Sequence, residues 1–245
     1  MRVEIGVESV AGARVAAAAG AARVELCAGL SDGGLTPSAA LIEAASALVE
    51  VHVLVRPRPG DFRYDRDELA VIVRDIAVAR EHGATGVVVG ALTDDGRVDD
   101  ACAAFVAAAA GMQTTFHRAI DVSADSRQAL DDVVSLGFTR VLTSGRRRSA
   151  LDGAPVIKDL VAQAAGRIEV MAGGGVRAAN AARVVAATGV DDVHAAPRRP
   201  VGHAAGGEVS YAGAGVPAGH DHFETDPDEV TALCKTWPTD SAKNR

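Results

Sequence analysis

The sequence predicts an α/β fold, a (β/α)8 TIM barrel in a single domain with an irregular C-terminal arm. Eight short apolar runs, each suited to a strand, alternate with helical patterns and leave no long gap between them. The runs are residues 3–7, 23–27, 51–55, 87–90, 114–117, 140–143, 168–172 and 192–195. A length of 245 residues suits one undivided barrel. A doubly wound open sheet is the alternative that the same alternation permits.

The predicted barrel domain covers residues 1–240, and residues 241–245 are predicted to form a tail. Residues 197–225 are rich in glycine, alanine and proline and lack periodicity, so we expect a long loop or arm after the last strand. Asp226 and Pro227 then predict the start of a final helix that runs through Cys234.

Helix signals separate the predicted strands. Ser9 can cap the first helix, and Pro37 follows Thr36 as proline does at a first helical position. The best-marked unit is residues 166–185, where a short apolar run leads into Gly173-Gly174-Gly175 and then an alanine-rich helical pattern. Glycines let backbone N–H groups approach a ligand closely, and the N-terminus of the following helix favours an anion. A tight turn that binds nothing is the alternative.

One regularity predicts which strand residues face the barrel interior. Glycines at four predicted helix ends are each followed four residues later by valine, at Val24, Val87, Val141 and Val193. If these valines face the helices, the residues that follow them form one interior layer, since strand side chains alternate. That layer is Glu25, Val88, Leu142 and His194. The next layer toward the mouth is Cys27, Gly90, Ser144 and Ala196.

Composition and charge narrow the functional class. The formal net charge is −7, which argues against a general nucleic-acid groove. No apolar run reaches about 18 residues, so we expect no membrane span, and residues 1–4 read as the start of a strand, not as a signal peptide. Three scattered cysteines fit free thiols in a reducing cytoplasm.

The fifth predicted strand ends in candidate catalytic residues. His117 at the strand terminus is the candidate for proton transfer near neutral pH. Arg118 can stabilise negative charge, and Asp121 can orient His117 or pair with an arginine. A structural ion-pair network is the alternative reading of the same residues.

Anion-binding groups follow the third, sixth and seventh strands. Arg56 and Arg58 lie on a proline-stiffened segment and can hold a carboxylate or phosphate. Ser144 and the Gly173-Gly174-Gly175 turn offer hydroxyl and backbone donors to the same anion. The basic residues of 146–148 and 198–199 can steer anions inward. Solvated surface arginines are the alternative.

Two glutamates lie inside the predicted strands and need partners, because an unpaired buried charge is costly. Arg56, Arg118 and His194 are the predicted partners of Glu4 and Glu25. We expect a structural role for Glu4, and either a general-base or a structural role for Glu25.

Metal-ligand candidates are few. Cys27 is the one soft ligand expected near the mouth and His194 is the candidate imidazole, and thiolate and imidazole select copper(I) or zinc. Cys102 and Cys234 fall on predicted helices as packing residues. His220 and His222 lie in the predicted arm, where a solvated loop is expected.

Six stretches together resemble the CutC family of copper-homeostasis proteins. They are RVELC at 23–27, GGLTPS at 33–38, RPRPGDF at 56–62, TFHRA at 115–119, RVLTSG at 140–145 and VMAGGG at 170–175. The resemblance covers nearly the whole chain. It implies a cytoplasmic TIM barrel, a homo-oligomer (dimer or tetramer), and a role in copper handling with copper(I) as the possible ligand.

The chain departs from the family pattern where copper would bind. Members often carry a cysteine in the first strand, where this chain has Gly6, while the companion cysteine is kept as Cys27. A two-thiolate copper(I) site would therefore lack one ligand. Ala22 also replaces an acidic residue of the pattern.

Three functions follow as hypotheses. The first is a copper-binding or copper-homeostasis protein, supported by the resemblance and Cys27. The second is an enzyme or binding protein for a small anionic metabolite, with His117 as acid/base and Arg56, Arg58 and Arg118 as anion clamp. The third is a noncatalytic assembly module. Whether the chain is an enzyme is left open.

Overall fold

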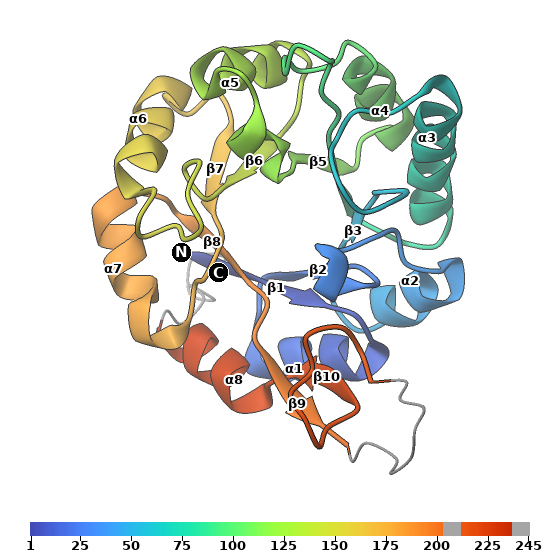
Figure 1. Cartoon of the computed structure of the whole chain (residues 1–245), viewed down its shortest axis with the longest axis vertical. Helices are drawn as coiled ribbons and strands as arrows, with labels where there is room; N and C mark the ends of the chain where they lie inside the picture. Colours follow the sequence, from blue (N-terminus) through green and yellow to red (C-terminus); the bar gives the residue numbers. More distant parts are fainter. Residues whose placement is uncertain (203–211, 237–245) are drawn as a thin grey trace, which may run out of the picture.

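Eight parallel strands form a closed barrel in the computed structural model, which describes residues 1–202 and 212–236 (Figure 1). Each strand pairs with the next, and β8 returns to β1, so the open-sheet alternative is excluded. The strands are β1 Arg2–Val7, β2 Arg23–Leu26, β3 Val51–Leu54, β4 Gly86–Val89, β5 Gln113–Phe116, β6 Arg140–Thr143, β7 Glu169–Ala172 and β8 Asp192–Ala195. The predicted (β/α)8 fold is confirmed.

A ring of helices covers the outside of the barrel (Figure 1). These helices are α1 Val10–Ala19, α2 Ala39–Ser46, α3 Arg66–Glu81, α4 Cys102–Ala109, α5 Ser126–Ser135, α6 Ala154–Ala164, α7 Ala178–Thr188 and α8 Pro227–Thr236. Local signals set their ends. Ser9 accepts a hydrogen bond from the Gly12 N–H at 3.0 Å to cap α1. Gly20, with φ of 78°, ends α1 in the left-handed conformation. Two short 3-10 turns, η1 Leu30–Asp32 and η2 Arg118–Val122, follow β2 and β5.

Strand side chains alternate between the helical ring and the barrel interior as predicted. Val24, Val87, Val141 and Val193 are fully buried in the core between strands and helices. The following residues face inward, and Glu25, Leu142 and His194 line the cavity at the barrel mouth. Val88 packs inside the barrel against Cys27 and Leu54.

The floor of the barrel interior is charged instead of apolar. Arg23 Nε donates to Glu4 Oε2 at 2.5 Å, and Arg23 Nη2 donates to Asp192 Oδ2 at 3.1 Å. Arg140 Nε donates to the same Asp192 oxygen at 3.2 Å. Side-chain exposures of 3% for Arg23, 2% for Asp192 and 0% for Glu4 place the pairs out of water. Buried charges of this kind persist only when paired.

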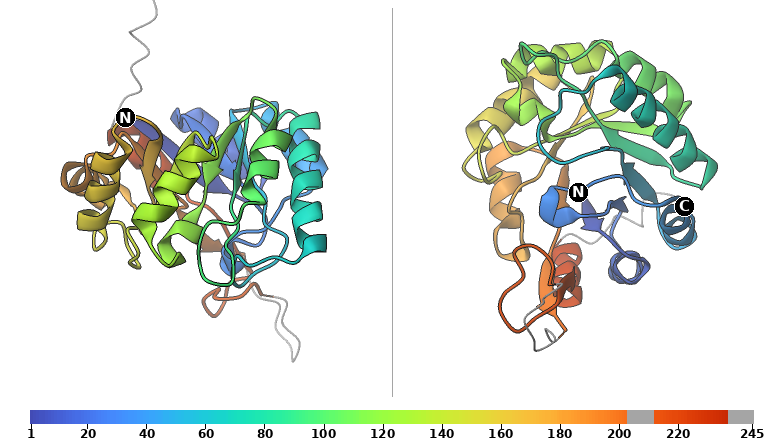
Figure 2. Two further views of the ribbon diagram at one scale, coloured as in Figure 1. Left: turned by 90° about the horizontal axis from the view of Figure 1, so that it is seen from above. Right: turned by 45° about the vertical axis from the view of Figure 1, so that its right-hand side comes forward.

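The chain after β8 differs from the predicted irregular arm. β9 Arg198–Val201 and β10 His222–Thr225 pair as a two-stranded antiparallel sheet, and α8 then packs between α1 and α7. This final helix starts where predicted and completes the ring, with Cys234 buried in it. The N-terminus lies on the opposite side of the barrel from the β9–β10 segment (Figure 2). The predicted tail at 241–245 and residues 203–211 of the predicted arm lie outside the described residues.

No helix in the described ranges has both the length and the apolar character that a membrane crossing requires.

Candidate functional site

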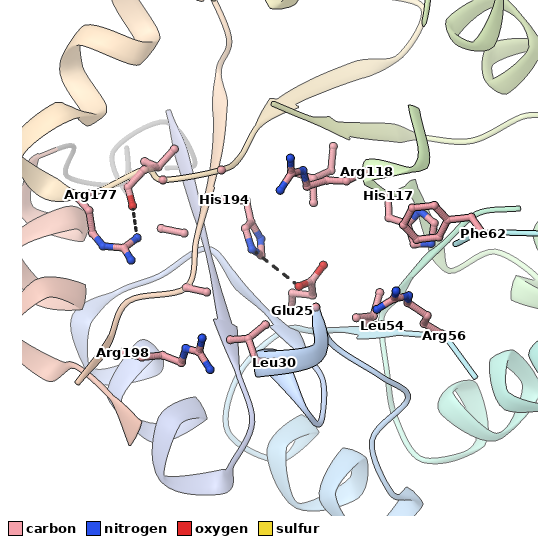
Figure 3. Close-up of a pocket in the computed structure, with 17 residues that line it drawn as sticks. Glu25, Leu30, Leu54, Arg56, Phe62, His117, Arg118, Arg177, His194 and Arg198 are labelled. Atoms are coloured by element: carbon pink, nitrogen blue, oxygen red, sulfur yellow. Dashed lines mark hydrogen bonds and ion pairs between the residues drawn. The ribbon is translucent and has the colours of Figure 1, made fainter. Parts of the chain in front are cut away.

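A cavity of about 320 Å³ opens at the carboxyl ends of the barrel strands, where the strand-to-helix loops converge (Figure 3). Among the residues that the structure describes, its lining includes four arginines, two histidines and a single carboxylate. These are Arg56, Arg118, Arg177, Arg198, His117, His194 and Glu25. Leu30, Leu54, Phe62 and Leu142 supply apolar wall between them.

Glu25 and His194 form the centre of this cavity and connect it to the charged floor. His194 lies between two carboxylates, with Nδ1 2.9 Å from Glu4 Oε1 and Nε2 3.8 Å from Glu25 Oε2. The strand register brings them together, because Glu4 pairs with His194 on one side and with Arg23 on the other. Of the partners predicted for the two glutamates, His194 is confirmed. Arg56 and Arg118 are wrong, since Arg23 holds Glu4 instead.

The three groups shift one another's proton affinity. Burial raises the pKa of Glu25, and the neighbouring Glu4 carboxylate adds to that effect, while His194 opposes it. Burial disfavours the His194 imidazolium, but the flanking Glu25 and Glu4 carboxylates outweigh it and raise the pKa of His194. Burial also opposes ionisation of Glu4, yet Arg23 and His194 hold the pKa of Glu4 far below its usual value. Glu25 and His194 therefore share the cavity as a coupled acid–base pair.

His117 differs from the predicted general acid/base. It is 5% exposed, and its Nδ1 accepts the Ala119 N–H at 3.3 Å, which leaves the proton on Nε2. Burial, with a contribution from the Arg56 charge, lowers the pKa of His117 to about 3. The ring is therefore neutral at pH 7, so it can donate a hydrogen bond but cannot act as an imidazolium acid.

Arg56 supports the mouth loops while facing the cavity. Its Nη1 donates to the carbonyls of Asp32 and Gly34, both at 3.0 Å, and its Nη2 donates to the carbonyl of Gly60 at 2.8 Å. The residue is 6% exposed. Among the described residues no carboxylate lies within ion-pair distance of it, so its positive charge is not compensated by a protein partner.

Arg118, Asp121 and Ser144 form a bonded group at the rim. Arg118 Nε donates to Asp121 Oδ2 at 2.8 Å, and Arg118 Nη2 donates to Ser144 Oγ at 2.7 Å. Ser144 Oγ in turn donates to Asp121 or to the Arg147 carbonyl, 2.8 and 2.6 Å away. Asp121 thus pairs with an arginine and does not orient His117. Ser144 does not line the cavity, so its predicted role as a direct anion ligand is not supported by its position.

The glycine turn after β7 faces the cavity in part. Gly174 and Gly175 line it, with φ of 99° and 68° that favour glycine. Gly173 does not, because its N–H donates to the Thr143 carbonyl within the barrel at 2.9 Å. Arg177 ends the turn, and its guanidinium donates to the Val176 carbonyl at 2.7 Å without a carboxylate partner in the described chain (Figure 3). Sequence reasoning missed Arg177, although it lies two residues after the glycines.

Arg58 was predicted in the anion clamp, and this placement is wrong. Its Nε donates to Glu68 Oε1 at 2.5 Å, and its Nη1 donates to Asp61 Oδ1 at 3.1 Å. The acidic first turn of α3 therefore holds Arg58 outside the cavity, and Arg198 supplies a cavity-lining arginine instead. Arg198 also forms an ion pair with Glu8 at 3.6 Å.

The predicted soft-metal ligands do not converge. Cys27 is fully buried under Leu54 and Leu30, lies outside the cavity lining, and has its pKa raised by burial and then by Glu25. Gly6 offers no side chain, and a Cβ there would lie 3.0 Å from the Ala196 Cβ. His194 is the metal candidate that does reach the cavity, grouped with Glu4 and Glu25 with ligand atoms within 4.8 Å of one another. Imidazole and carboxylates without a thiolate do not suit copper(I).

Two further histidines lie apart from this site. His222 begins β10 with an exposed side chain, and neither it nor His220 lines the cavity. The side chain of His222 is exposed, but it lies on a strand and His220 is half-buried, so the predicted solvated loop differs from the structure.

Comparison with known proteins places these features in a family. The CutC family model matches residues 1–198. A protein of Pasteurella multocida named "family protein CutC" is 44% identical over 197 residues, covering 79% of this chain and 81% of that protein. The "Copper homeostasis protein cutC homolog" of Homo sapiens is 45% identical over 199 residues, covering 80% of this chain and 73% of that protein.

A solved structure agrees with this match. The crystal structure of the putative copper homeostasis protein CutC from Streptococcus agalactiae superposes with a TM-score of 0.76 at 35% identity, covering 79% of this chain and 97% of that one. The family-model match, residues 1–198, contains all eight barrel strands and every cavity residue named above. The chain therefore belongs to the CutC family.

Proposed function

We propose that the cavity binds a small metabolite that carries a phosphate or carboxylate group. One observation carries this proposal. Four arginines line the cavity against one carboxylate, and neither Arg56 nor Arg177 has a carboxylate partner among the described residues. Unpaired guanidinium groups in a partly desolvated cleft attract anions and bind their oxygens by charge-assisted hydrogen bonds.

The unpaired Arg177 and the adjacent glycine backbone favour the β7–β8 side of the mouth for the anion. Gly174 and Gly175 bring their backbone next to Arg177, and Arg198 follows β8. Barrels frequently bind phosphate with the loops after these two strands. We assign the anion to Arg177 and Arg198 and the rest of the ligand to the space over Glu25.

Thermal unfolding in the presence of anions tests the proposal. The probes are inorganic phosphate, propyl phosphate and propionate, each compared with chloride at equal ionic strength. A ligand that binds only the folded state raises its stability by about 2.7 kcal/mol at a hundred times the Kd. We expect such a rise for at least one probe.

Two matched arginine variants give the control. Arg177→Ala should weaken the affinity for the anion by about tenfold or more, since a charged hydrogen bond contributes roughly 1.5–3 kcal/mol. The rise in stability at a given anion concentration should fall accordingly. Arg14→Ala removes the same charge from an exposed position on α1, outside the cavity, and should leave the rise unchanged. Equal responses of both variants and the wild type would show that the anion site is misplaced.

A role in copper homeostasis is the second proposal, supported by the names of the human and streptococcal relatives. The buried thiol of Cys27 and the side-chain-free Gly6 argue against a two-thiolate copper(I) site in this chain. Titration of the reduced protein with copper(I) against a competing chelator tests it. Binding with high affinity that Cys27→Ala abolishes would support copper as the ligand, and affinity unchanged in Cys27→Ala would remove Cys27 as a ligand.

We also propose a cytoplasmic location and a homo-oligomer, either a dimer or a tetramer, on the basis of the family resemblance alone. Size-exclusion chromatography with light scattering measures the oligomeric state, and a monomer at all concentrations would contradict it.

A further inference from the structure

Two fully buried nitrogen atoms in the cavity wall, His117 Nε2 and Arg56 Nε, have no hydrogen-bond partner among the described residues. The Glu25 carboxylate, on a residue that is 5% exposed, also receives no hydrogen bond from the described residues, and His194 Nε2 lies 3.8 Å from it. Buried polar groups are nearly always paired, so each unpaired one calls for a partner that the described chain does not supply. All three residues line the same cavity. Their chemistry is complementary, since two are donors and one is an acceptor.

The donor character of His117 is fixed by the backbone. Its Nδ1 accepts from the Ala119 N–H, so the ring carries its proton on Nε2. Burial and the Arg56 charge keep the ring neutral, with a pKa of about 3. A neutral imidazole N–H next to a guanidinium N–H makes a pair of donors suited to one oxygen that gains negative charge.

Phe62 shields both donors from water. Its ring centroid lies 4.5 Å from that of His117 and 5.3 Å from Arg56 Cζ. Phe62 lies on the loop between β3 and α3 and is half-buried, so its ring can turn aside without disturbing a strand. An oxygen that replaces the ring edge would satisfy both donors in a site from which water is excluded.

Glu25 provides the acceptor. No hydrogen bond from the described residues reaches its carboxylate, and its nearest charged neighbour is His194 Nε2 at 3.8 Å. A carboxylate that is buried and lacks hydrogen-bond donors has a raised proton affinity, as suits a general base near neutral pH. In Figure 3 Glu25 lies between the His117 and Arg56 side of the cavity and the Arg177 and Arg198 side.

We propose that the cavity transfers a proton at a carbon next to a carbonyl group of a small anionic ligand, with Glu25 as the base and the N–H groups of His117 and Arg56 as the oxygen site. This inference rests on the proposed anion site and adds the chemical class of the ligand, a phosphorylated or carboxylated carbonyl compound.

The proton transfer balances without another reactant. The α C–H bond breaks and its proton forms an O–H bond with Glu25. The electron pair of that bond forms a C=C bond, and the carbonyl π pair moves onto oxygen, where the two N–H groups hold the enolate. Return of a proton from Glu25 to the same carbon regenerates the carbonyl compound, and in D2O this cycle exchanges the α proton for deuterium. Among the described residues no lysine lines the cavity, so they offer no amine for a Schiff base with the carbonyl.

His194 and Glu4 are positioning residues in this scheme. The Glu4 carboxylate at 2.9 Å from Nδ1 fixes the His194 ring, and the opposite nitrogen faces Glu25. A neighbouring imidazolium stabilises the Glu25 carboxylate, so replacement of His194 should move the pH profile of exchange to higher pH without abolishing it. A purely structural role would lower the amount of folded protein and leave the profile in place.

Two matched ligand pairs test the proposal by calorimetry. Hydroxyacetone phosphate and propyl phosphate share the phosphate, and pyruvate and propionate share the carboxylate. In each pair only the first has the carbonyl. For the pair whose anion binds, we expect the carbonyl member to bind about tenfold tighter or better. The advantage should disappear in His117→Phe, which keeps the ring and loses the donor.

Exchange in D2O gives a second readout of the same proposal. Proton NMR should show loss of the α-proton signals of the carbonyl member in the presence of wild-type protein. Glu25→Gln keeps the shape of the side chain and should slow this loss by about a hundredfold or more. In a separate measurement in H2O, the Nε2–H signal of His117 in 15N-histidine-labelled wild-type protein should shift with the carbonyl member alone, which tests the donor without a substitution.

The outcomes separate the two proposals. If neither pair binds, the anion site fails, and this inference fails with it. If the alkyl member binds through Arg177 but the carbonyl adds neither affinity nor exchange, the anion site stands and the proton-transfer site is overturned. Exchange that persists in Glu25→Gln would overturn the assignment of the base.

Discussion

Replacement of Arg23 by methionine removes the central cation of the barrel floor. Arg23 donates to Glu4 at 2.5 Å and to Asp192 at 3.1 Å, and both carboxylates are out of water. Loss of one partner of a buried pair costs about 3–5 kcal/mol, because the other charge stays buried. Glu4 keeps His194, and Asp192 keeps Arg140. The lower end, about 3 kcal/mol, is therefore expected.

Urea unfolding at pH 7, followed by far-UV circular dichroism, measures this loss. In a separate thermal unfolding experiment, a loss of about 3 kcal/mol in a chain of this size corresponds to a fall of roughly 6–12 °C in Tm. Arg14→Met on the exposed face of α1 is the control and should stay within about 0.5 kcal/mol of wild type. A stability of Arg23→Met equal to that of the control would refute the idea that the floor charges depend on one another.

Three further predictions concern titration and reactivity. Because the pKa of His194 is raised in the folded state, its protonation stabilises the fold below the unfolded pKa of about 6.5, and this stabilisation is lost as pH rises through the folded pKa. The difference in unfolding free energy between wild type and His194→Gln should therefore narrow from pH 6 to pH 9, and a constant difference would contradict the prediction. Because the pKa of Glu4 is lowered in the folded state, its ionised carboxylate stabilises the fold above the unfolded pKa of Glu4. Acid unfolding curves should therefore show that wild type loses more stability than Glu4→Gln as pH falls below about 4.5. The buried thiols of Cys27, Cys102 and Cys234 should resist Ellman's reagent at pH 8 in the native protein and react fully in urea, and a fast thiol lost in Cys27→Ala would disprove the burial of Cys27.

The barrel and its inward-facing residues could be predicted from the sequence because strand and helix periods alternate without a break. The valines four residues after helix-ending glycines fixed which strand residues point inward, and Glu25 and His194 follow from them. This inference needed only local geometry. It therefore succeeded without knowledge of how the strands pair.

Features that depend on contacts between distant segments could not be predicted. Arg58 is withdrawn from the mouth by Glu68 in the next helix, and the sequence does not show which arginine of the pair faces inward. The Arg23–Glu4 pair needs the β1–β2 register. β9 and β10 pair across 20 intervening residues without a short turn between them, so the local pattern indicated only a loop.

The protonation state of His117 and the accessibility of the Cys27 thiol could not be predicted from the sequence either. His117 at a strand end suggested an acid/base, but burial beside Arg56 and the Ala119 N–H make it a neutral donor. Cys27 does face inward as predicted, yet Leu54 and Leu30 cover its thiol. In both cases the residue was identified correctly, and its environment decided its chemistry.

A crystal soaked in tungstate tests the central claim most directly, because anomalous scattering locates the anion without any assumption about the ligand. Uncompensated arginines at the barrel mouth predict a peak within hydrogen-bond distance of the Arg177 guanidinium, beside the Gly174-Gly175 turn. Peaks found only outside the mouth, with the cavity vacant, would contradict the anion site and the chemistry proposed upon it.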